Sequence, residues 1–484
     1  MNPIWTLVPP LLVIPFIIFF GERHRNLREA SIVIAGLCLL AINDRLYSGL
    51  MAGDSMVSGK LALLDDYSLQ LSVEPMGVMF GLLASFLWVV TTVYSIGYMR
   101  GHNEQNQTRF YCCFALAIAC VMAAAYADNL LTLFVAYEAI TLSTFPLVTH
   151  AGNNESKKAG RLYLLLLMCG SIGLFLPAII WIATAAGTLT FTAGGVLNDA
   201  GLSKGALGVL LALCVFGVGK AAIMPMHRWL PAAMVAPTPV SALLHAVAVV
   251  KTGVFTLLKL ITYIFGIDLI STSGVADAIL PIVAFTIIAS SLIAFTKDNL
   301  KARLAYSTIS QLSYIIMAAL LATTMSVTGG ALHIVMHAFG KITLFFCAGA
   351  IMVSLHIKQI SELDGMGRRM PITMVAFFIG ALGIIGLPPA SGVWSKLLIA
   401  GGSLDHGNAI WLGVLMLSTL LNIAYLLPIP LRAFFKPPKE PYSGGWSEAP
   451  FPSLWAITVT AMACVLLFLF PQPLLDLLGL IHWR

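Results

Sequence analysis

The stretch Gly217–Pro231 reads GVGKAAIMPMHRWLP, and it places Lys220 inside an apolar run that two prolines then interrupt. A lysine at the centre of a membrane helix costs about 2.5 to 3.5 kcal/mol, and a proline removes a backbone donor. Pro225 is expected to free the carbonyl of Ala221 beside Lys220. Freed backbone within a membrane must be buried in protein or face water. The stretch therefore predicts a broken helix with local hydration around the charge.

The composition of the whole chain is that of an integral membrane protein. Of its 484 residues, 59% are hydrophobic and only 10% are charged. Apolar runs of about 17 to 25 residues recur along the chain, whereas the short alternating segments of a transmembrane barrel are missing. The net charge of +6 is distributed between the apolar segments, so it does not indicate a nucleic-acid partner. The start of the chain has no basic n-region or cleavage site and is interpreted as a first span.

Fourteen spans are predicted. They cover approximately residues 4–20, 30–43, 73–98, 110–127, 129–149, 162–186, 206–226, 232–266, 275–296, 303–324, 327–356, 371–400, 408–434 and 452–472. Basic residues accumulate in cytoplasmic loops and so test the count. Eighteen of the 27 basic residues fall in odd-numbered connections, and only Arg45, Lys60, Lys204 and Arg484 fall in even-numbered connections or at the ends. This distribution predicts that both termini lie on the non-cytoplasmic side.

The remaining five lysines lie inside apolar segments: Lys220, Lys251, Lys259, Lys341 and Lys396. Charges this costly indicate a conduction or ligand role by default. Lys259 is nearer the end of its span, so a peripheral, snorkelling position is equally open for it.

An acidic residue also lies within a span. Glu138 stands alone among apolar residues in NLLTLFVAYEAITLSTFPL, near the predicted middle of the membrane. An isolated carboxylate in lipid is driven toward its neutral form, whereas an opposing lysine favours the charged form. The sequence therefore predicts an ion pair between Glu138 and Lys220. The alternative is a structural salt bridge that only fixes two helices.

Two further segments carry titratable groups in series. His245 and Lys251 are six residues apart, and His333, His337 and Lys341 follow one another at i, i+4 and i+8. The second set forms one stripe, about 12 Å long, on a single helix face. A metal site or satisfied core histidines are the alternatives, although no acidic third ligand or HExxH pattern accompanies them. Since histidine exchanges protons near neutral pH, the stripe indicates a proton relay.

A second broken helix is expected in FFIGALGIIGLPPASGVWSKLLIA, where Pro388 and Pro389 precede Lys396. Two interrupted spans, five spans apart and each with a lysine, suggest inverted repeats of spans four to eight and nine to thirteen. The predicted divisions are 1–106 for spans one to three, 107–270 for the first repeat, 271–435 for the second repeat and 436–484 for the last span.

Four runs resemble a known family. KAAIMPMHRWLPAAMVAPTPVSALLHAVAVVKTGVF, DNLKARLAYSTISQLSY, HIVMHAFGKITLFFCAG and GLPPASGVWSK look like the antiporter-like subunits of respiratory complex I, Mrp-type cation/proton antiporters and membrane-bound hydrogenases. The resemblance covers nearly the whole chain. It implies an all-α subunit of fourteen transmembrane helices that conducts protons, with two inverted five-helix repeats and broken helices seven and twelve.

The resemblance also assigns residues. Glu138 and Lys220 match the first-half ion pair of the family, Lys251 its central lysine and Lys396 its second-half terminal residue. His333, His337 and Lys341 match the connecting polar axis. Lys396 departs from relatives with glutamate there and resembles those with lysine, including Mrp D-type subunits. Glu74 stands where the family more often has an Asp-Gly pair, which leaves its role open.

Proton translocation in a bacterial or archaeal cytoplasmic membrane is the function that these features predict, coupled to exchange of a monovalent cation, with sodium as the candidate. The chain ends soon after its last span and so most resembles the shorter D-type subunits. GxGxxG, CxxC and P-loop motifs are missing, so no cofactor or metal is expected, and any redox chemistry belongs to partner subunits of an antiporter or complex I-like (NADH:quinone) assembly. A non-conducting scaffold and a lone carrier of an organic substrate are the competing interpretations.

Overall fold

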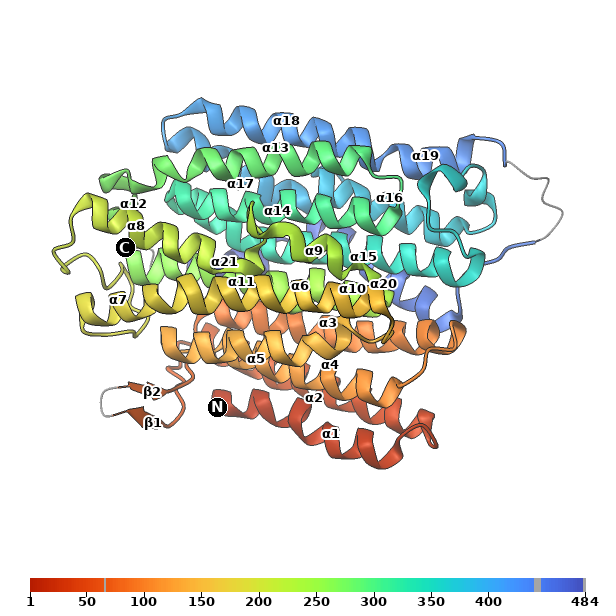
Figure 1. The fold of residues 1–484 in the computed structure, drawn as a ribbon, viewed down its shortest axis with the longest axis horizontal. Coiled ribbons are helices and arrows are strands. Elements are labelled where there is room, and N and C mark those ends of the chain that lie inside the picture. The colour runs from red at the N-terminus through yellow and green to blue at the C-terminus, as the bar shows by residue number, and fades with distance from the viewer. Residues whose placement is uncertain (65–66, 439–444, 482–484) are drawn as a thin grey trace.

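The computed structural model describes residues 1–64, 67–438 and 445–481; Arg484 lies outside these ranges. Figure 1 shows one bundle in which most helices run along the long dimension and the turns gather at its two ends. A short antiparallel pair, β1 (Leu61–Leu64) and β2 (Tyr67–Leu69), lies at one end. We call this the hairpin end, and we call the opposite end, where the turn between the first two long helices lies, the basic end. The expected all-α fold is confirmed, and this short hairpin lies beside the helical bundle.

The helices of the first part of the chain are α1 (Val8–Phe20), α2 (Arg25–Met51), α3 (Pro75–Gly101), α4 (Gln107–Ala125), α5 (Leu130–Val148), α6 (Asn154–Gly170), α7 (Leu176–Ala186), α8 (Lys204–Gly217), α9 (Trp229–Ala232), α10 (Thr238–Ala242), α11 (Val249–Lys259) and α12 (Ile267–Ser273). Those of the second part are α13 (Leu280–Thr296), α14 (Leu300–Leu321), α15 (Thr324–Leu355), α16 (Pro371–Ile385), α17 (Gly392–Asp405), α18 (Ala409–Leu426), α19 (Pro428–Phe435), α20 (Phe451–Leu469) and α21 (Gln472–Gly479). Short π-helical segments join several of them, at Ser171–Phe175, Leu243–Val247 and Leu260–Phe265.

Within the described residues, 12 helical segments are long and apolar enough to cross a membrane, and α8 and α16 are shorter apolar helices. The largest difference from the predicted boundaries is in the second span, which was expected over 30–43 and is found over Arg25–Met51. The apolar pattern underestimates this helix because Arg28 and Glu29 are buried within it and form an ion pair.

The intramembrane lysines lie on or against the innermost helices. All residues of the segment Thr238–Phe265 and nearly all of α14 are buried, whereas most residues of α2, α18 and α20 are not. A charged side chain facing hydrocarbon is costly, so an inner position is where such residues can be kept.

The first helix break begins earlier than its prolines. α8 ends at Gly217, and the chain continues through a 3-10 turn, Gly219–Ala221, that contains Lys220. Pro225 lies further along, and Pro231 lies within the short helix α9. The expectation that Pro225 breaks the helix by releasing the Ala221 carbonyl is therefore wrong, because the helix has already ended.

The interior of this break is closed. Lys220 and the following Ala221, Ala222 and Ile223 have no exposed surface. The Trp229 indole Nε1 donates to the carbonyl of Gly219 at 3.0 Å and so satisfies one backbone group that the break releases. The expected hydrated pocket is thus not open to the surface here.

The second break follows the predicted pattern. α16 ends at Ile385, Pro388 and Pro389 lie in the turn, and α17 begins at Gly392. Gly386 has a φ of 84°, and a Cβ atom there would lie 2.7 Å from Cδ of Lys396. A glycine is needed at this position both for its backbone conformation and for the space that the lysine fills.

Lys259 and Glu74, whose roles the sequence left open, form an ion pair near the hairpin end. Lys259 Nζ lies 2.7 Å from Glu74 Oε1 and donates to the Ala127 carbonyl at 2.8 Å. The Phe191 ring centroid is 4.0 Å from the ammonium group. Lys259 is fully buried, so the peripheral position is excluded. The pair ties the start of α3 and the end of α4 to α11.

Replacing Lys259 with methionine is expected to destabilise the protein by about 3 kcal/mol, because Glu74 would keep a largely buried charge without a partner. Thermal unfolding of the purified chain in detergent measures the change as a lower midpoint. The double variant Glu74→Gln/Lys259→Met should recover part of the loss, and Lys204→Met, at an exposed lysine, serves as control. A Lys259→Met midpoint equal to that of the wild type would contradict this stabilising role.

Candidate functional site

A direct contact between two helices forms the centre of the site. Lys251 on α11 and His337 on α15 are both buried, and Lys251 Nζ lies 2.7 Å from His337 Nδ1. The ring of His333, one turn away on α15, has its centroid 5.8 Å from that of His337. The structure therefore brings three of the predicted residues together from two segments far apart in the sequence, although His337 Nε2 has no hydrogen-bond partner in the described residues and no hydrogen bond joins the two rings there.

The line continues from His333 toward Lys396. His333 Nδ1 lies 2.8 Å from Ser395 Oγ, and His333 Nε2 lies 3.1 Å from Gln311 Oε1. Both ring nitrogens thus have protein partners, and no group of three potential metal ligands is found among the described residues. The Tyr314 ring centroid lies 5.9 Å from that of His333 and 4.8 Å from Lys396 Nζ. The Tyr314 ring therefore lies between His333 and Lys396, but no hydrogen bond joins those two residues in the described part of the chain.

Lys396 is held by the second helix break. Its Nζ donates to the carbonyl of Ile385, the last residue of α16, at 2.9 Å. A cation is favourable at a helix C-terminus because the last carbonyls are unpaired and the helix dipole is negative there. The break supplies the partner that this lysine needs.

Lys341 and His245 meet at α14 rather than on the central line. Lys341 Nζ donates to Ser307 Oγ at 2.7 Å and to the Leu304 carbonyl at 3.2 Å. His245 Nδ1 lies 3.0 Å from Oγ1 of Thr308, the neighbour of Ser307, and its Nε2 has no hydrogen-bond partner in the described part of the chain. The two groups form a branch beside the Lys251–His337 contact.

Lys220 is held by α5, but not through Glu138. Its Nζ donates to the Tyr137 carbonyl at 2.8 Å and to Thr141 Oγ1 at 2.5 Å, and it lies 3.2 Å from the Tyr137 ring centroid. No ion pair joins Lys220 to Glu138 within residues 1–64, 67–438 and 445–481, and both buried carboxylate oxygens of Glu138 lack a hydrogen-bond partner there. The predicted ion pair is therefore not formed in this structure.

Helix geometry accounts for this difference. Tyr137 and Thr141 are four residues apart and share one face of α5, whereas Glu138 is rotated by about 100° from Tyr137. The lysine in its 3-10 turn therefore meets the carbonyl and hydroxyl on that face.

The first break packs directly against α11. A Cβ atom at Gly253 would lie 2.4 Å from Ala221 N and 2.9 Å from Lys220 Cβ. Only glycine permits this approach, which places Lys220 close to the helix that carries Lys251. No hydrogen bond links the side chains of Lys220 and Lys251 in the described ranges, so Lys220 is not connected to the Lys251–His337 contact by a direct hydrogen bond.

Sequence reasoning missed the hydroxyl and amide groups that connect the charges. Ser307, Gln311 and Tyr314 lie at i, i+4 and i+7 on α14, inside the run that the resemblance had singled out. Their spacing indicates one helix face. Serine and tyrosine are common on packed membrane helices, however, so the signal could not assign them to the site before the neighbouring helices were placed.

A cleft at the basic end approaches the site. It has a volume of about 580 Å³ and is lined by Glu104, Pro231, Thr238, Lys301 and Lys358, among others. Lys301 Nζ donates to the Ala236 carbonyl at 2.6 Å, just before α10. The cleft thus reaches the start of the helical segment that carries His245 and Lys251.

Known proteins are similar to this chain in sequence and in fold. NADH-quinone oxidoreductase subunit N of Desulforudis audaxviator (strain MP104C) is 27% identical over 457 residues, which cover 92% of this chain and 89% of that protein. NADH-ubiquinone oxidoreductase chain 5 of Sus scrofa is 32% identical over 382 residues, which cover 78% of this chain and 60% of that longer protein. A chain of the Mrp complex from Dietzia sp. DQ12-45-1b has the same fold, with a TM-score of 0.86 at 21% identity over 99% of this chain and 96% of that one.

The family match covers the elements described above. Residues 127–422 match the family described as NADH:quinone oxidoreductase/Mrp antiporter, TM. This range is more than half of the chain and contains α5, both helix breaks and every predicted lysine and histidine of the site. The protein therefore belongs to the NADH:quinone oxidoreductase/Mrp antiporter transmembrane family.

Proposed function

We propose that this chain is a proton-translocating subunit of a multi-subunit complex in a bacterial or archaeal cytoplasmic membrane. Protons move along a buried axis that comprises Glu138, Lys220, His245, Lys251, His333, His337, Lys341 and Lys396. The observation that carries the proposal is the arrangement of Lys251, His337, His333 and Ser395. Lys251 Nζ lies 2.7 Å from His337 Nδ1, the ring centroids of His337 and His333 are 5.8 Å apart, and His333 Nδ1 lies 2.8 Å from Ser395 Oγ. The first and last of these contacts are within direct proton-transfer distance, and in this proposal a water molecule connects His337 Nε2, which has no hydrogen-bond partner in the described residues, to His333.

The proposed membrane architecture has fourteen spans. The 12 long apolar segments, together with α8 and α16, support this number when α8 and α16 are counted as parts of the broken helices seven and twelve. We propose inverted repeats over 107–270 and 271–435, with 1–106 and 436–484 outside them. An even number of spans places both termini on one side, and the basic loops favour the non-cytoplasmic side for them.

Entry from the basic end follows from the cleft that reaches Thr238. From there a proton passes His245 and Lys251, crosses to His337 and His333, and leaves near Lys396. Four lysines lie along this axis, yet none of them pairs with a carboxylate in the described ranges. Like charges repel strongly in a dry interior, so a proton added to one amine favours release from another.

Lys220 and Glu138 act as the switch of the first half in this proposal. In the structure, Lys220 binds Tyr137 and Thr141, and Glu138 has an unpartnered carboxylate on the adjacent position of the same helix. A rotation of the lysine side chain would close the pair. Closing it stabilises the charged amine, and opening it favours transfer of its proton onward.

Coupling to cation exchange, with sodium as the cation, is the leading proposal, by analogy with the Mrp complex that shares this fold. The named relative NADH-quinone oxidoreductase subunit N supports a second candidate, in which redox chemistry in partner subunits drives the same axis. Oxygen-rich sites suit sodium better than lysines do, so we place its site mainly in partner subunits. A non-conducting scaffold is the alternative that the following experiments exclude or establish.

Replacement of Lys220 with alanine is expected to lower proton transport by the assembled complex about 100-fold, because a relay group is removed. Glu138→Gln should give a loss in the same direction because the switch loses its charge. Transport is measured in proteoliposomes as dissipation or formation of a pH gradient, with Lys157→Ala at an exposed lysine as the matched control. Wild-type transport in both variants, with normal assembly, would establish the scaffold interpretation.

The contact between Lys251 and His337 predicts strongly non-additive losses. Lys251→Met and His337→Phe should each reduce transport to nearly the same level, and the double variant should be little worse, because groups in series interrupt one path. The logarithms of the three transport rates test this prediction. Independent losses that simply add would show that the two residues serve separate paths.

A further inference from the structure

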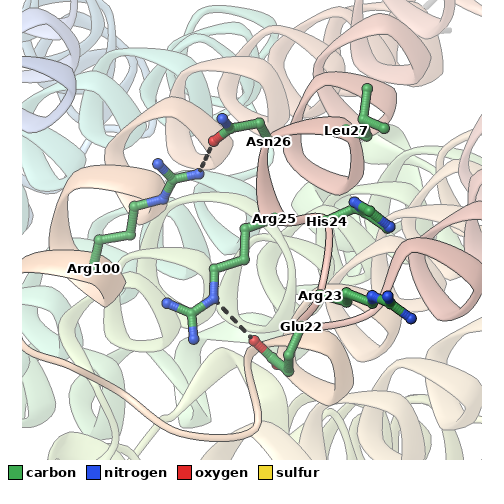
Figure 2. A pocket seen from close by; sticks show the side chains of 7 residues that line it. All are labelled: Glu22, Arg23, His24, Arg25, Asn26, Leu27 and Arg100. Atoms are coloured by element: carbon green, nitrogen blue, oxygen red, sulfur yellow. Dashed lines mark hydrogen bonds and ion pairs between the residues drawn. The ribbon is translucent and has the colours of Figure 1, made fainter.

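A hollow at the basic end lies outside the proton axis. It has a volume of about 760 Å³ and is formed by the turn between α1 and α2 together with the end of α3. We call it the basic hollow; its lining residues are Glu22, Arg23, His24, Arg25, Asn26, Leu27 and Arg100 (Figure 2). An apolar groove of about 410 Å³ adjoins it, shares Asn26 and Arg100 with it, and is otherwise lined by Glu29, Ala30, Val33, Ile34 and Ile96.

The two carboxylates that line the hollow and the groove are already paired with arginines: Glu22, which is 43% exposed, and the buried Glu29. Glu22 accepts hydrogen bonds from the Thr108 backbone and hydroxyl at 2.8 and 3.0 Å and lies 3.1 Å from the fully buried Arg28. Burial would raise the pKa of Glu22, but the hydrogen bonds from Thr108 and Arg28 outweigh it and hold this pKa below its ordinary value. Glu29 forms an ion pair with Arg100. The two glutamates are thus committed to Arg28 and Arg100.

Arg23 and Arg25 therefore retain most of their charge for a ligand. Arg25 has only a 3.6 Å contact from Nε to Glu22, and its side chain is 50% exposed. Arg23 and His24 are exposed, and Figure 2 draws no interaction for either of them. Figure 2 also shows Arg25 and Arg100 on the same side of the turn. Arg100 also borders the hollow with 39% of its side chain exposed, but Glu29 balances its charge and it donates to Asn26 Oδ1 at 2.7 Å (Figure 2).

The groove continues from this charged region along the membrane-facing side of α2. Asn26, Ala30 and Val33 lie at i, i+4 and i+7 on one face, which spans about 10 Å along the helix. Ile34 is 60% exposed. A basic hollow at the membrane surface that opens into an apolar groove matches a molecule with an anionic head and a hydrocarbon tail.

We propose that the basic hollow and the apolar groove bind one anionic phospholipid of the surrounding leaflet. Its phosphate binds Arg25 and faces the exposed part of Arg100, whose charge Glu29 balances. Arg23 adds attraction, and one acyl chain lies along Ala30, Val33 and Ile34. Arginines at the cytoplasmic ends of membrane helices bind phospholipid head groups because their planar donors match phosphate oxygens. The charge of the hollow and its continuity with the groove distinguish it from an ordinary solvated loop.

The full chain, alone or in its complex, is titrated with phosphatidylglycerol and phosphatidylcholine and analysed by native mass spectrometry. We expect one phosphatidylglycerol to bind in preference to phosphatidylcholine. The double variant Arg23→Gln/Arg25→Gln should bind phosphatidylglycerol about 30-fold more weakly, because it loses one charged contact with the head group at each arginine. Lys157→Gln/Lys158→Gln removes the same charge from exposed lysines of another turn and should leave binding unchanged.

Two further measurements distinguish a bound lipid from a bound inorganic anion in the basic hollow. Ala30→Trp, at an exposed position in the groove, should also weaken the lipid, whereas inorganic phosphate should neither compete with it nor raise the unfolding temperature. Competition by inorganic phosphate at similar concentration would overturn the proposal in favour of a simple anion site. Equal binding of both lipids would overturn it, as would an Arg23→Gln/Arg25→Gln variant that keeps the lipid and loses a partner subunit.

Discussion

The cost of burying a charge in a membrane protein constrains the rest of this structure. Each intramembrane lysine has a specific partner, and the partners differ: a helix carbonyl and a hydroxyl for Lys220, a histidine for Lys251, a serine for Lys341 and the end of a helix for Lys396. Neutral partners stabilise an ammonium group while leaving it free to lose its proton. A carboxylate would hold the charge in place, and Lys259 is the one lysine of the five that has such a partner in the described residues.

This contrast separates two kinds of buried cation on one helical segment. Lys251 and Lys259 both lie on α11, but Lys259 is surrounded by Glu74, a backbone carbonyl and an aromatic ring, all near the hairpin end. Such a pair fixes structure and is expensive to break. Among the described residues, the hydrogen-bond partner of the Lys251 ammonium group is the titratable ring of His337. The difference in partners supports a structural role for one lysine and a transport role for the other.

The helix breaks follow from the same constraint. In the second break, a released carbonyl at the end of α16 binds Lys396, and Gly386 leaves space for the side chain. In the first, a 3-10 turn positions Lys220 against α5, and Gly253 lets that turn touch α11. The second break therefore supplies a polar partner within the membrane without adding charge, whereas the first break places its lysine against partners on α5. The proposed lipid site lies at the rim of the bundle, where arginines can meet an external partner instead.

The sequence by itself determined the membrane class, most of the apolar segments, which lysines and histidines lie within them, and the helix break at Pro388 and Pro389. These are local properties, since hydrophobic runs, proline and unfavourable charges are visible without any neighbour. Tertiary structure alone decided the partners. Lys220 meets Tyr137 and Thr141 instead of Glu138 because the rotation of α5 selects one face, and Glu74 meets Lys259 across 185 positions of sequence. The packing of α14, α15 and α17 places three further partners: Ser395, Gln311 and Ser307. Their hydrogen bonds depend on the register between neighbouring helices, and the sequence of one helix does not determine that register.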